Sequence, residues 1–305
     1  MILCAGEALI DMLPRESTTA EACFAPYPGG AVFNTAIALG RLGVRTGFFC
    51  PISDDLFGTQ LRAALEASGV DHSVSPAVDR PCTLAFVTLV DGQARYAFYD
   101  RGTALRDLTE AELPVLTEEM RALFFGGISL VGDPCGRAFE TLCARAGARL
   151  VMLDPNIRPG FIRDETAYRA RLAAMMARAD IVKLSDEDLR WLMGAGDLAG
   201  LARAVLTQGP QIVILTEGAK GARAYVAGGD VHAQAQPVAV VDTVGAGDTF
   251  NGGFLAGLAR ANALSKSALT ALPETVLQEA LGLGTQAAAV TVSRAGANPP
   301  WARDL

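Results

Sequence analysis

The sequence has 305 residues, of which 50% are hydrophobic and 19% are charged, and its formal net charge is −7. This length and composition suffice for a large buried core, which excludes a disordered or fibrous chain. The negative charge argues against nucleic acid as the main partner, because binding to a duplex needs a basic face. No apolar run approaches the roughly 18 residues of a membrane-spanning helix. Residues 1–13 contain acidic but no basic side chains, so we expect neither a membrane partner nor a secretion signal.

Six cysteines and two histidines limit the redox and metal chemistry of the chain. The cysteines form no CxxC pair, and His72 and His232 stand far apart in the sequence. Neither histidine lies in a recognisable motif, and the cysteines show no metal-ligand spacing, so the sequence indicates no multi-histidine or cysteine metal site. We therefore expect reduced thiols and a cytoplasmic location.

Apolar strands alternate with amphipathic helices along most of the chain. The expected strands cover residues 2–5, 45–50, 123–125, 150–153, 181–183 and 212–216. The expected helices cover 31–41, 56–68, 136–146, 165–178, 186–193, 197–207 and 273–292. Because the strand runs are continuously apolar, they are typical of parallel strands that are covered on both faces. The pattern predicts an α/β fold, with an open, mostly parallel twisted sheet between helix layers, in one domain over 1–305.

One region departs from the strand–helix alternation. Residues 83–90 and 95–99 are rich in β-formers and are joined by the turn-like residues 91–94, which is a hairpin signal. Extended segments at 9–13 and 21–24 are possible partners for this hairpin. We expect a small β-sheet, built from about 9–26 and 82–101, that stands off the main sheet and covers a pocket as a lid.

A glycine-rich stretch at 242–250 carries the strongest chemical signal. It follows a strand-like run at 238–241 and precedes a helix expected from about Thr249 to Arg260. The small residues Gly245, Ala246 and Gly247 let backbone N–H groups converge at a helix N-terminus, where an anion is favoured. Asp248 lies at the edge of this site and could accept a proton from an attacking hydroxyl. From these residues alone, an ordinary glycine turn with a first-turn acid is an equally good interpretation.

A second stretch opens the first long helix. Gly29 and Gly30 would let the backbone approach a polyhydroxyl ligand, and Asn34 offers both a hydrogen-bond donor and an acceptor. From these residues alone, a glycine helix cap with a locally bonded asparagine is the favoured interpretation. The sequence contains neither GxxxxGK[ST] nor GxGxxG, which disfavours a Walker NTPase and a dinucleotide-binding fold.

Taken together, the two stretches resemble the signatures of the ribokinase/PfkB family of carbohydrate kinases, and the resemblance extends over essentially the whole chain. It implies a ribokinase-like fold and transfer of a phosphoryl group from ATP, with Mg²⁺, to a hydroxyl of a monosaccharide. The similarity to bacterial fructokinases makes D-fructose the expected acceptor. A 2-keto-3-deoxygluconate kinase, another sugar or nucleoside kinase of the family and a non-catalytic sugar sensor remain open as alternatives.

The family pattern assigns roles to individual residues of this chain. It implies a sugar site that comprises Asp11, Gly29, Gly30, Asn34, Tyr99, Arg101 and Arg158. It implies nucleotide contacts from Lys183, Ser185, Thr216, Gly218, Gly221 and Asn298. Asp188, where the family has glutamate, would reach Mg²⁺ through water, and Asp242, Val244 and Gly296 would supply backbone ligands to a monovalent cation, K⁺. A homodimer that forms through the lid is a further implication.

The catalytic group in this interpretation is Asp248, which would orient the sugar hydroxyl and take its proton. We expect it to be a weak base, because a helix N-terminus favours the ionised form of a carboxylate. Weak basicity suffices, since phosphoryl transfer is loose and the hydroxyl becomes acidic late. The N–H groups of Gly245, Ala246 and Gly247 would stabilise the transferred phosphoryl group.

Overall fold

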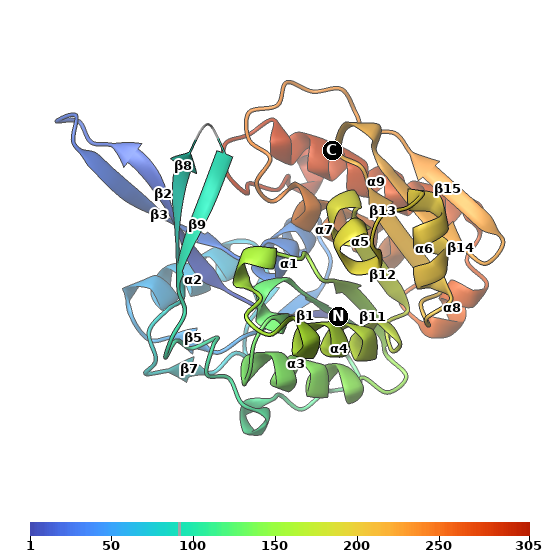
Figure 1. Cartoon of the computed structure of the whole chain (residues 1–305), viewed down its shortest axis with the longest axis horizontal. Coiled ribbons are helices and arrows are strands. Elements are labelled where there is room, and N and C mark those ends of the chain that lie inside the picture. The colour runs from blue at the N-terminus through green and yellow to red at the C-terminus, as the bar shows by residue number, and fades with distance from the viewer. Residues whose placement is uncertain (91–92) are drawn as a thin grey trace.

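The computed structural model describes residues 1–90 and 93–305, so the tip of the expected hairpin, at Asp91 and Gly92, lies outside the described residues. The described chain contains a nine-stranded sheet in the order β15-β14-β13-β12-β11-β10-β1-β4-β6 (Figure 1). Its strands are β1 (Ile2–Ala5), β4 (Thr46–Phe49), β6 (Val70–Asp71), β10 (Ala122–Gly126), β11 (Leu150–Asp154), β12 (Ile181–Ser185), β13 (Ile212–Thr216), β14 (Ala222–Val226) and β15 (Gly229–Ala233). All neighbours from β6 to β13 are parallel, which confirms the predicted α/β fold.

Helices cover both faces of this sheet. The helices are α1 (Ala31–Arg41), α2 (Leu56–Ala67), α3 (Cys135–Ala144), α4 (Glu165–Met176), α5 (Asp186–Met193), α6 (Leu198–Leu206), α7 (Ala246–Arg260), α8 (Lys266–Thr270) and α9 (Glu274–Val292). One layer contains α1, α7 and α9, and the other contains α3 to α6 (Figure 1). The central strands β1, β10, β11 and β12 are almost completely buried between them, because their apolar side chains face helices on either side.

Helix α7 packs unusually close to its neighbours. A Cβ atom on Gly252 would lie 2.6 Å from the Cβ of Ala38 in α1, and one on Gly257 would lie 2.6 Å from the Cα of Ala280 in α9. Only glycine leaves room for these backbone approaches. The first and last helical segments of the fold therefore meet around α7.

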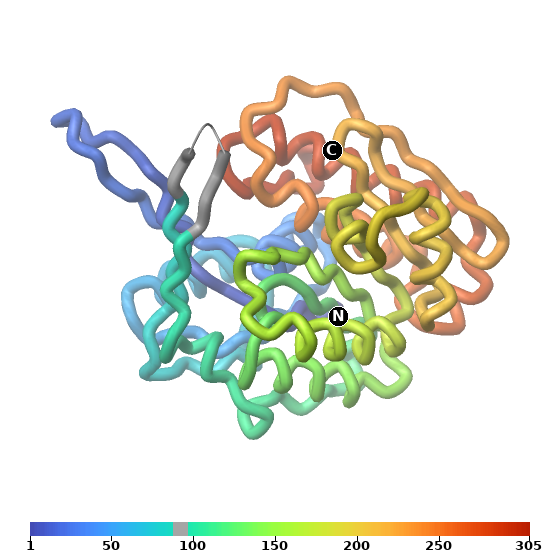
Figure 2. The backbone as a smooth tube through the Cα atoms, viewed as in Figure 1, coloured from blue at the N-terminus to red at the C-terminus, as the bar shows by residue number. Residues whose placement is uncertain are grey.

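The predicted small sheet is also confirmed. It has the strand order β3-β2-β8-β9 and is made of β2 (Leu9–Glu16), β3 (Ala22–Gly29), β8 (Leu84–Val90) and β9 (Gln93–Tyr99). The backbone trace shows it projecting from the rest of the molecule, which we call the body (Figure 2). A further strand pair, β5 (Ile52–Ser53) and β7 (Ala77–Val78), lies near its base.

In the C-terminal half, the strands of the structure differ from those expected from the sequence in two places. The strand expected at 238–241 is absent from the described fold, because Val241 N and Asp242 N both donate to Val292 O rather than to a neighbouring strand. Instead, β14 and β15 extend the sheet as an antiparallel hairpin. β15 is the edge strand, and both strands mix buried with partly exposed residues, so the sequence shows no continuous apolar run there.

Candidate active site

The candidate site lies where the parallel strands of the main sheet end. Asp154, Ser185 and Thr216 are the last residues of β11, β12 and β13, so the sheet brings them to one edge. The N-termini of α1 and α7 meet the same edge, beside the base of the small sheet. Open α/β sheets bind their ligands at this edge, outside the carboxyl ends of the strands.

A cleft of about 400 Å³, which we call the central cleft, opens there. It collects most of the site residues that the sequence predicted. Those that line it are Asp11, Gly30, Asn34, Arg158, Lys183, Ser185, Asp188, Thr216, Val244, Gly245, Ala246, Gly247 and Asp248. The two signature stretches thus come together in space although they lie at opposite ends of the sequence.

A second cavity of about 540 Å³, the outer pocket, adjoins the central cleft. Its lining is mainly apolar and includes Gly218, Gly221, Val238, Val240, Phe250, Ala288, Ala289 and Val292. Thr216, Thr243, Ala246 and Gly247 line both cavities. The first turn of α7 is therefore the wall at which the two cavities meet.

The start of α7 exposes backbone donors to both cavities. The helix begins at Ala246, three residues earlier than expected, because Gly245 adopts a φ of 76° that a glycine tolerates. No described side chain caps this helix. Ala246 N donates to Thr243 O at 3.3 Å, whereas the N–H groups of Gly247 and Asp248 have no acceptor among the described residues. Such a helix start is suited to binding an anion.

Asp248 lies in this first turn and is directly connected to the other signature stretch. Its Oδ2 accepts a hydrogen bond of 2.9 Å from Asn34 Nδ2, and its backbone oxygen accepts one of 3.1 Å from Thr35 Oγ1. No described residue donates to Asp248 Oδ1, which leaves this oxygen available to a ligand.

The protonation of Asp248 differs from the sequence expectation. Burial raises the pKa of this carboxyl to about 7, although the Asn34 hydrogen bond acts in the opposite direction. The side chain is only 7% exposed, so loss of hydration outweighs the helix dipole. A carboxylate that titrates near neutral pH is well matched to proton transfer.

A buried ion pair lies beneath the start of α7. Lys183 Nζ is 3.0 Å from Asp154 Oδ2, which also accepts a 2.7 Å hydrogen bond from Asn251 Nδ2. Burial alone would lower the pKa of Lys183, but the carboxylates of Asp154, Asp188 and Asp248 outweigh it and raise the pKa. A Cβ on Gly247 would come within 3.1 Å of Lys183 Nζ, so the absent side chain keeps this cation close to the helix start.

Sequence reasoning did not assign a site role to Glu7, Asp154 or Asn251. Glu7 is buried in the cleft floor, where Oε1 accepts from Ala31 N at 2.9 Å and Oε2 accepts from Ser129 N at 3.2 Å. Burial raises the pKa of Glu7. Glu7 and Asp154 each follow or end a buried parallel strand, which is the signal that could have identified them.

Asp11 and Gly29 form one side of the cleft entrance. A Cβ on Gly29 would approach Asp11 Oδ2 within 2.2 Å, so Gly29 provides space for the carboxylate rather than lining the cleft itself. Burial raises the pKa of Asp11 to about 6.

Asp188 is largely occupied by protein donors. Its Oδ1 accepts from Ile157 N at 2.8 Å, and its Oδ2 accepts from the backbone N and Oγ of Ser185 at 3.0 and 2.7 Å. Among the described residues, no group of three or more His, Cys, Asp or Glu side chains could hold a metal ion. Glu187 also lines the cleft and has no partner among the described residues. This donor set fits a Mg²⁺ ion that is held mainly by phosphates and water, as Mg²⁺ usually is.

Several predicted site residues lie outside both cavities. Tyr99 is 64% exposed and packs on Phe86, because successive strand residues face opposite sides and it is Phe98 that lines the central cleft. Arg101 is exposed just beyond β9. Asn298 Oδ1 accepts from Arg41 Nη1 at 2.8 Å. These three residues therefore line neither cavity, and their family-based contacts stay a prediction.

Asp242 connects two loops beside the start of α7. Its Oδ1 accepts from Val244 N at 3.0 Å, and its Oδ2 accepts from Gly296 N at 2.9 Å. The loop that contains Gly296 is thereby fixed next to the loop before α7.

None of the described helices is long and apolar enough to cross a bilayer.

Comparison with known proteins agrees with this geometry. Residues 1–303 match the model of the pfkB family carbohydrate kinases. A fructokinase of Rhizobium leguminosarum bv. trifolii is 53% identical over 279 residues, which cover 91% of this chain and 86% of that protein. A fructokinase of Salmonella typhimurium is 34% identical over 307 residues, or 98% of this chain and 96% of the relative. The crystal structure of a fructokinase with bound ATP from Xylella fastidiosa has a TM-score of 0.87 at 27% identity, covering 97% and 93% of the two chains.

Proposed function

Because the chain belongs to the pfkB family of carbohydrate kinases, we propose that it transfers the γ-phosphate of ATP to a hydroxyl of D-fructose. The observation that carries the proposal is the position of Asp248, which lines the central cleft directly after Ala246 and Gly247 at the wall to the outer pocket and is bonded to Asn34. Fructose is favoured because relatives at 53% and 34% identity are fructokinases.

The sugar is proposed to occupy the central cleft. Asp11 and Asn34 supply an acceptor and a donor to its hydroxyls. Gly30 lets the backbone lie close to the ring, and Gly29 leaves space for the Asp11 carboxylate. Arg158 is exposed at the same cleft, where its Nη1 donates only to the adjacent Ile157 O. The small sheet closes over the cleft as a lid, which would exclude water from the reaction.

The nucleotide is proposed to lie across the start of α7. The outer pocket, with Gly218 and Gly221 in its lining, takes the apolar base, and the phosphates extend past Thr216 towards the central cleft. Lys183 and Ser185 face the phosphates from the other side, and Asn298 belongs to the loop that closes nearby.

The reaction follows from these positions. Asp248 Oδ1 accepts the proton of the sugar hydroxyl, whose oxygen then bonds to the γ-phosphorus while the bond from that phosphorus to the bridging oxygen of ADP breaks. The N–H groups of Gly245, Ala246 and Gly247 and the buried Lys183 ammonium stabilise the phosphoryl charge. Positioning and charge stabilisation supply most of the rate in this kind of transfer.

Two ions belong to the proposal. Mg²⁺ would neutralise phosphate charge, with Glu187 and Asp188 as its nearest acidic side chains in the cleft. K⁺ would be held by the loops of Val244 and Gly296, which Asp242 fixes side by side.

The proposal is tested by measuring ADP formation with fructose, ribose, 2-keto-3-deoxygluconate and nucleosides. We expect fructose to give the highest kcat/KM. The Asp248→Asn variant should lose about two to four orders of magnitude in kcat, the usual contribution of a general base. Asp186→Asn is the matched control, because Asp186 is also a first-turn acid but lies outside the cleft.

Arg158 provides a specific argument for one alternative substrate, the acidic sugar 2-keto-3-deoxygluconate. Its guanidinium could pair with the carboxylate of 2-keto-3-deoxygluconate, so higher activity with that sugar than with fructose would reassign the substrate. Sugar binding without ADP formation from any acceptor would favour the sensor interpretation.

A homodimer through the small sheet is a further part of the proposal. Phe24, Tyr27 and Tyr99 are 42%, 42% and 64% exposed on this sheet, which is unusual for aromatic side chains unless a partner covers them. Light scattering should report a dimer that Tyr99→Glu dissociates. Val115→Glu is the control, since Val115 is 83% exposed but lies outside this sheet.

A cytoplasmic location is proposed on the state of the thiols. All six cysteines, which lie in the described part of the chain, are free. Five of them are buried, which is typical of proteins from reducing compartments.

A further inference from the structure

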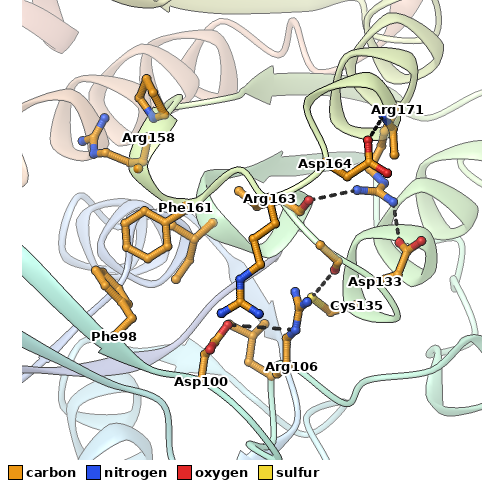
Figure 3. Close-up of a pocket in the computed structure, with 17 residues that line it drawn as sticks. Phe98, Asp100, Arg106, Asp133, Cys135, Arg158, Phe161, Arg163, Asp164 and Arg171 are labelled. Atoms are coloured by element: carbon orange, nitrogen blue, oxygen red, sulfur yellow. Dashed lines mark hydrogen bonds and ion pairs between the residues drawn. The ribbon is translucent and has the colours of Figure 1, made fainter.

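A third cavity, the side cavity, has a volume of about 780 Å³ and lies next to the central cleft (Figure 3). It is enclosed by the end of β9 from the small sheet, by the segment that contains Arg106, and by residues 158–164 of the body. Phe98 and Phe161 line both this cavity and the central cleft, and their rings meet edge to face with centroids 3.9 Å apart. The aromatic pair thus stands between the two spaces.

Most charged groups of the side cavity are neutralised by protein partners. Arg171 is buried, forms ion pairs with Asp133 and Glu140, and donates to Leu130 O at 2.8 Å. Asp164 caps α4 by accepting from Ala167 N at 2.9 Å. These groups have structural roles and are not available to a ligand.

Three guanidinium groups remain, those of Arg106, Arg158 and Arg163, and Arg158 also lines the central cleft. Arg106 lies 3.9 Å from Asp100, which is a loose ion pair, and Arg163 has no hydrogen bond or ion pair with any described residue. Figure 3 shows the Arg163 side chain directed towards Asp100 and Arg106, and the residue is exposed. Among the described residues, Arg106 has a carboxylate partner and Arg163 has none, so an excess of positive charge remains beside Asp100.

The remaining walls suit an organic molecule. Leu105, Ile128, Val131 and Pro159 contribute apolar surface around Arg106 and Arg163. The volume falls within the range of small-molecule sites and exceeds what a single inorganic ion needs. Guanidinium groups bind phosphate oxygens through paired, charge-assisted hydrogen bonds.

We propose that the side cavity binds a phosphate group between Arg106 and Arg163, at a site separate from the sugar and the nucleotide. Two sources share this chemistry, namely free inorganic phosphate and the phosphate of a small organic monoester whose body packs on the apolar walls. Because Arg106 lies in the segment that follows β9 and Arg163 lies just before α4, the bound phosphate connects two segments that are far apart in the sequence.

The experiment is isothermal titration calorimetry of the full chain with inorganic phosphate, fructose 1-phosphate and fructose 6-phosphate, each in the presence of excess fructose. We expect saturable 1:1 binding of at least one probe. Arg163→Ala should weaken it by about tenfold or more, since hydrogen bonds to charged groups are the strong ones, and Arg163→Lys should weaken it less. The probe that binds most tightly identifies the source.

The controls separate this site from the active site. Arg145→Ala removes an equivalent charge at the end of α3, outside the cavity, and should leave the affinity unchanged. Arg163→Ala should retain the kcat for the sugar, because Arg163 lines neither the central cleft nor the outer pocket. Absence of binding by all three probes, or equal affinity in wild type and Arg163→Ala, would overturn the proposal. Because the titration does not depend on turnover, failure to phosphorylate fructose would refute the proposed function and leave this result intact.

Discussion

Replacing Asn34 with alanine should shift the acidic limb of the pH–rate profile to higher pH. Burial raises the pKa of Asp248 to about 7, and the 2.9 Å hydrogen bond from Asn34 partly offsets that increase. The base is active when ionised, so activity falls as the pH drops through this pKa. Without the Asn34 donor, the ionised carboxylate loses a stabilising partner, and its pKa rises further.

The size of the shift follows from the strength of that bond. A hydrogen bond to a charged group contributes about 1.5–3 kcal/mol, and about 1.4 kcal/mol corresponds to one pKa unit, so the pKa should move to roughly 8–9. At pH 7 the ionised fraction then falls from about one half to between roughly one tenth and one hundredth. We expect kcat/KM at pH 7 to fall about 5- to 50-fold from this cause and to recover as the pH is raised to 9.

The assay is kcat/KM for the sugar at saturating ATP between pH 5 and pH 9.5. Asp11→Asn is the control, because Asp11 also lines the cleft but its pKa, about 6, lies below the limb in question. That variant should raise KM and leave the limb near pH 7 in place. A uniform loss of activity in Asn34→Ala, with the limb unmoved, would refute the assignment of Asp248 as the base that Asn34 tunes.

Further variants test the buried groups around the helix start. Asp248→Asn should raise the melting temperature more at pH 8 than at pH 4, because the raised pKa stabilises the fold below the unfolded value of about 3.8 and this contribution is lost as the pH rises through 7. Lys183→Met should lower the free energy of unfolding in urea by about 3–5 kcal/mol, since it leaves Asp154 buried without its cation, and adding Asp154→Asn should restore most of it. Gly247→Val should reduce kcat/KM for ATP at least about tenfold by covering the N–H groups of the first turn. Gly282→Val, at a position open to its surroundings, should retain activity, and equal losses in both would contradict the anion-site interpretation.

Much of the fold could be predicted because its strongest patterns are local. The continuous apolar runs of β11, β12 and β13 require burial on both faces, and helix 31–41 was predicted with the bounds that α1 has. The β14–β15 hairpin was not predicted, because its strands mix buried and partly exposed residues and lack a continuous apolar run. Residues 238–241 have the composition of a strand but do not form one. Among the described residues, that run pairs with no strand, and whether a pairing partner exists depends on the arrangement of the whole sheet.

The candidate site was predicted as motifs but not as interactions. The two signature stretches indicated Asn34 and Asp248 separately, whereas the bond between them results from the packing of α1 against α7. The pKa of Asp248 could not be predicted either, because burial is a property of the assembled cleft while the helix dipole can be read from the local sequence. The family pattern implies a substrate contact for Tyr99, which stays a prediction, whereas strand alternation directs Phe98 to the central cleft.

The close approach of α7 to α1 and α9 has a consequence for how such an enzyme can change. At Gly252 and Gly257 the backbones are already in contact, so the segment that carries Asp248 has no free space in which to slide or rotate. We therefore expect this helix to keep its position. Conformational change is expected in the small sheet, which has few neighbours outside its base. The position of Asp248 is therefore set by helix packing and does not depend on the conformation of the small sheet.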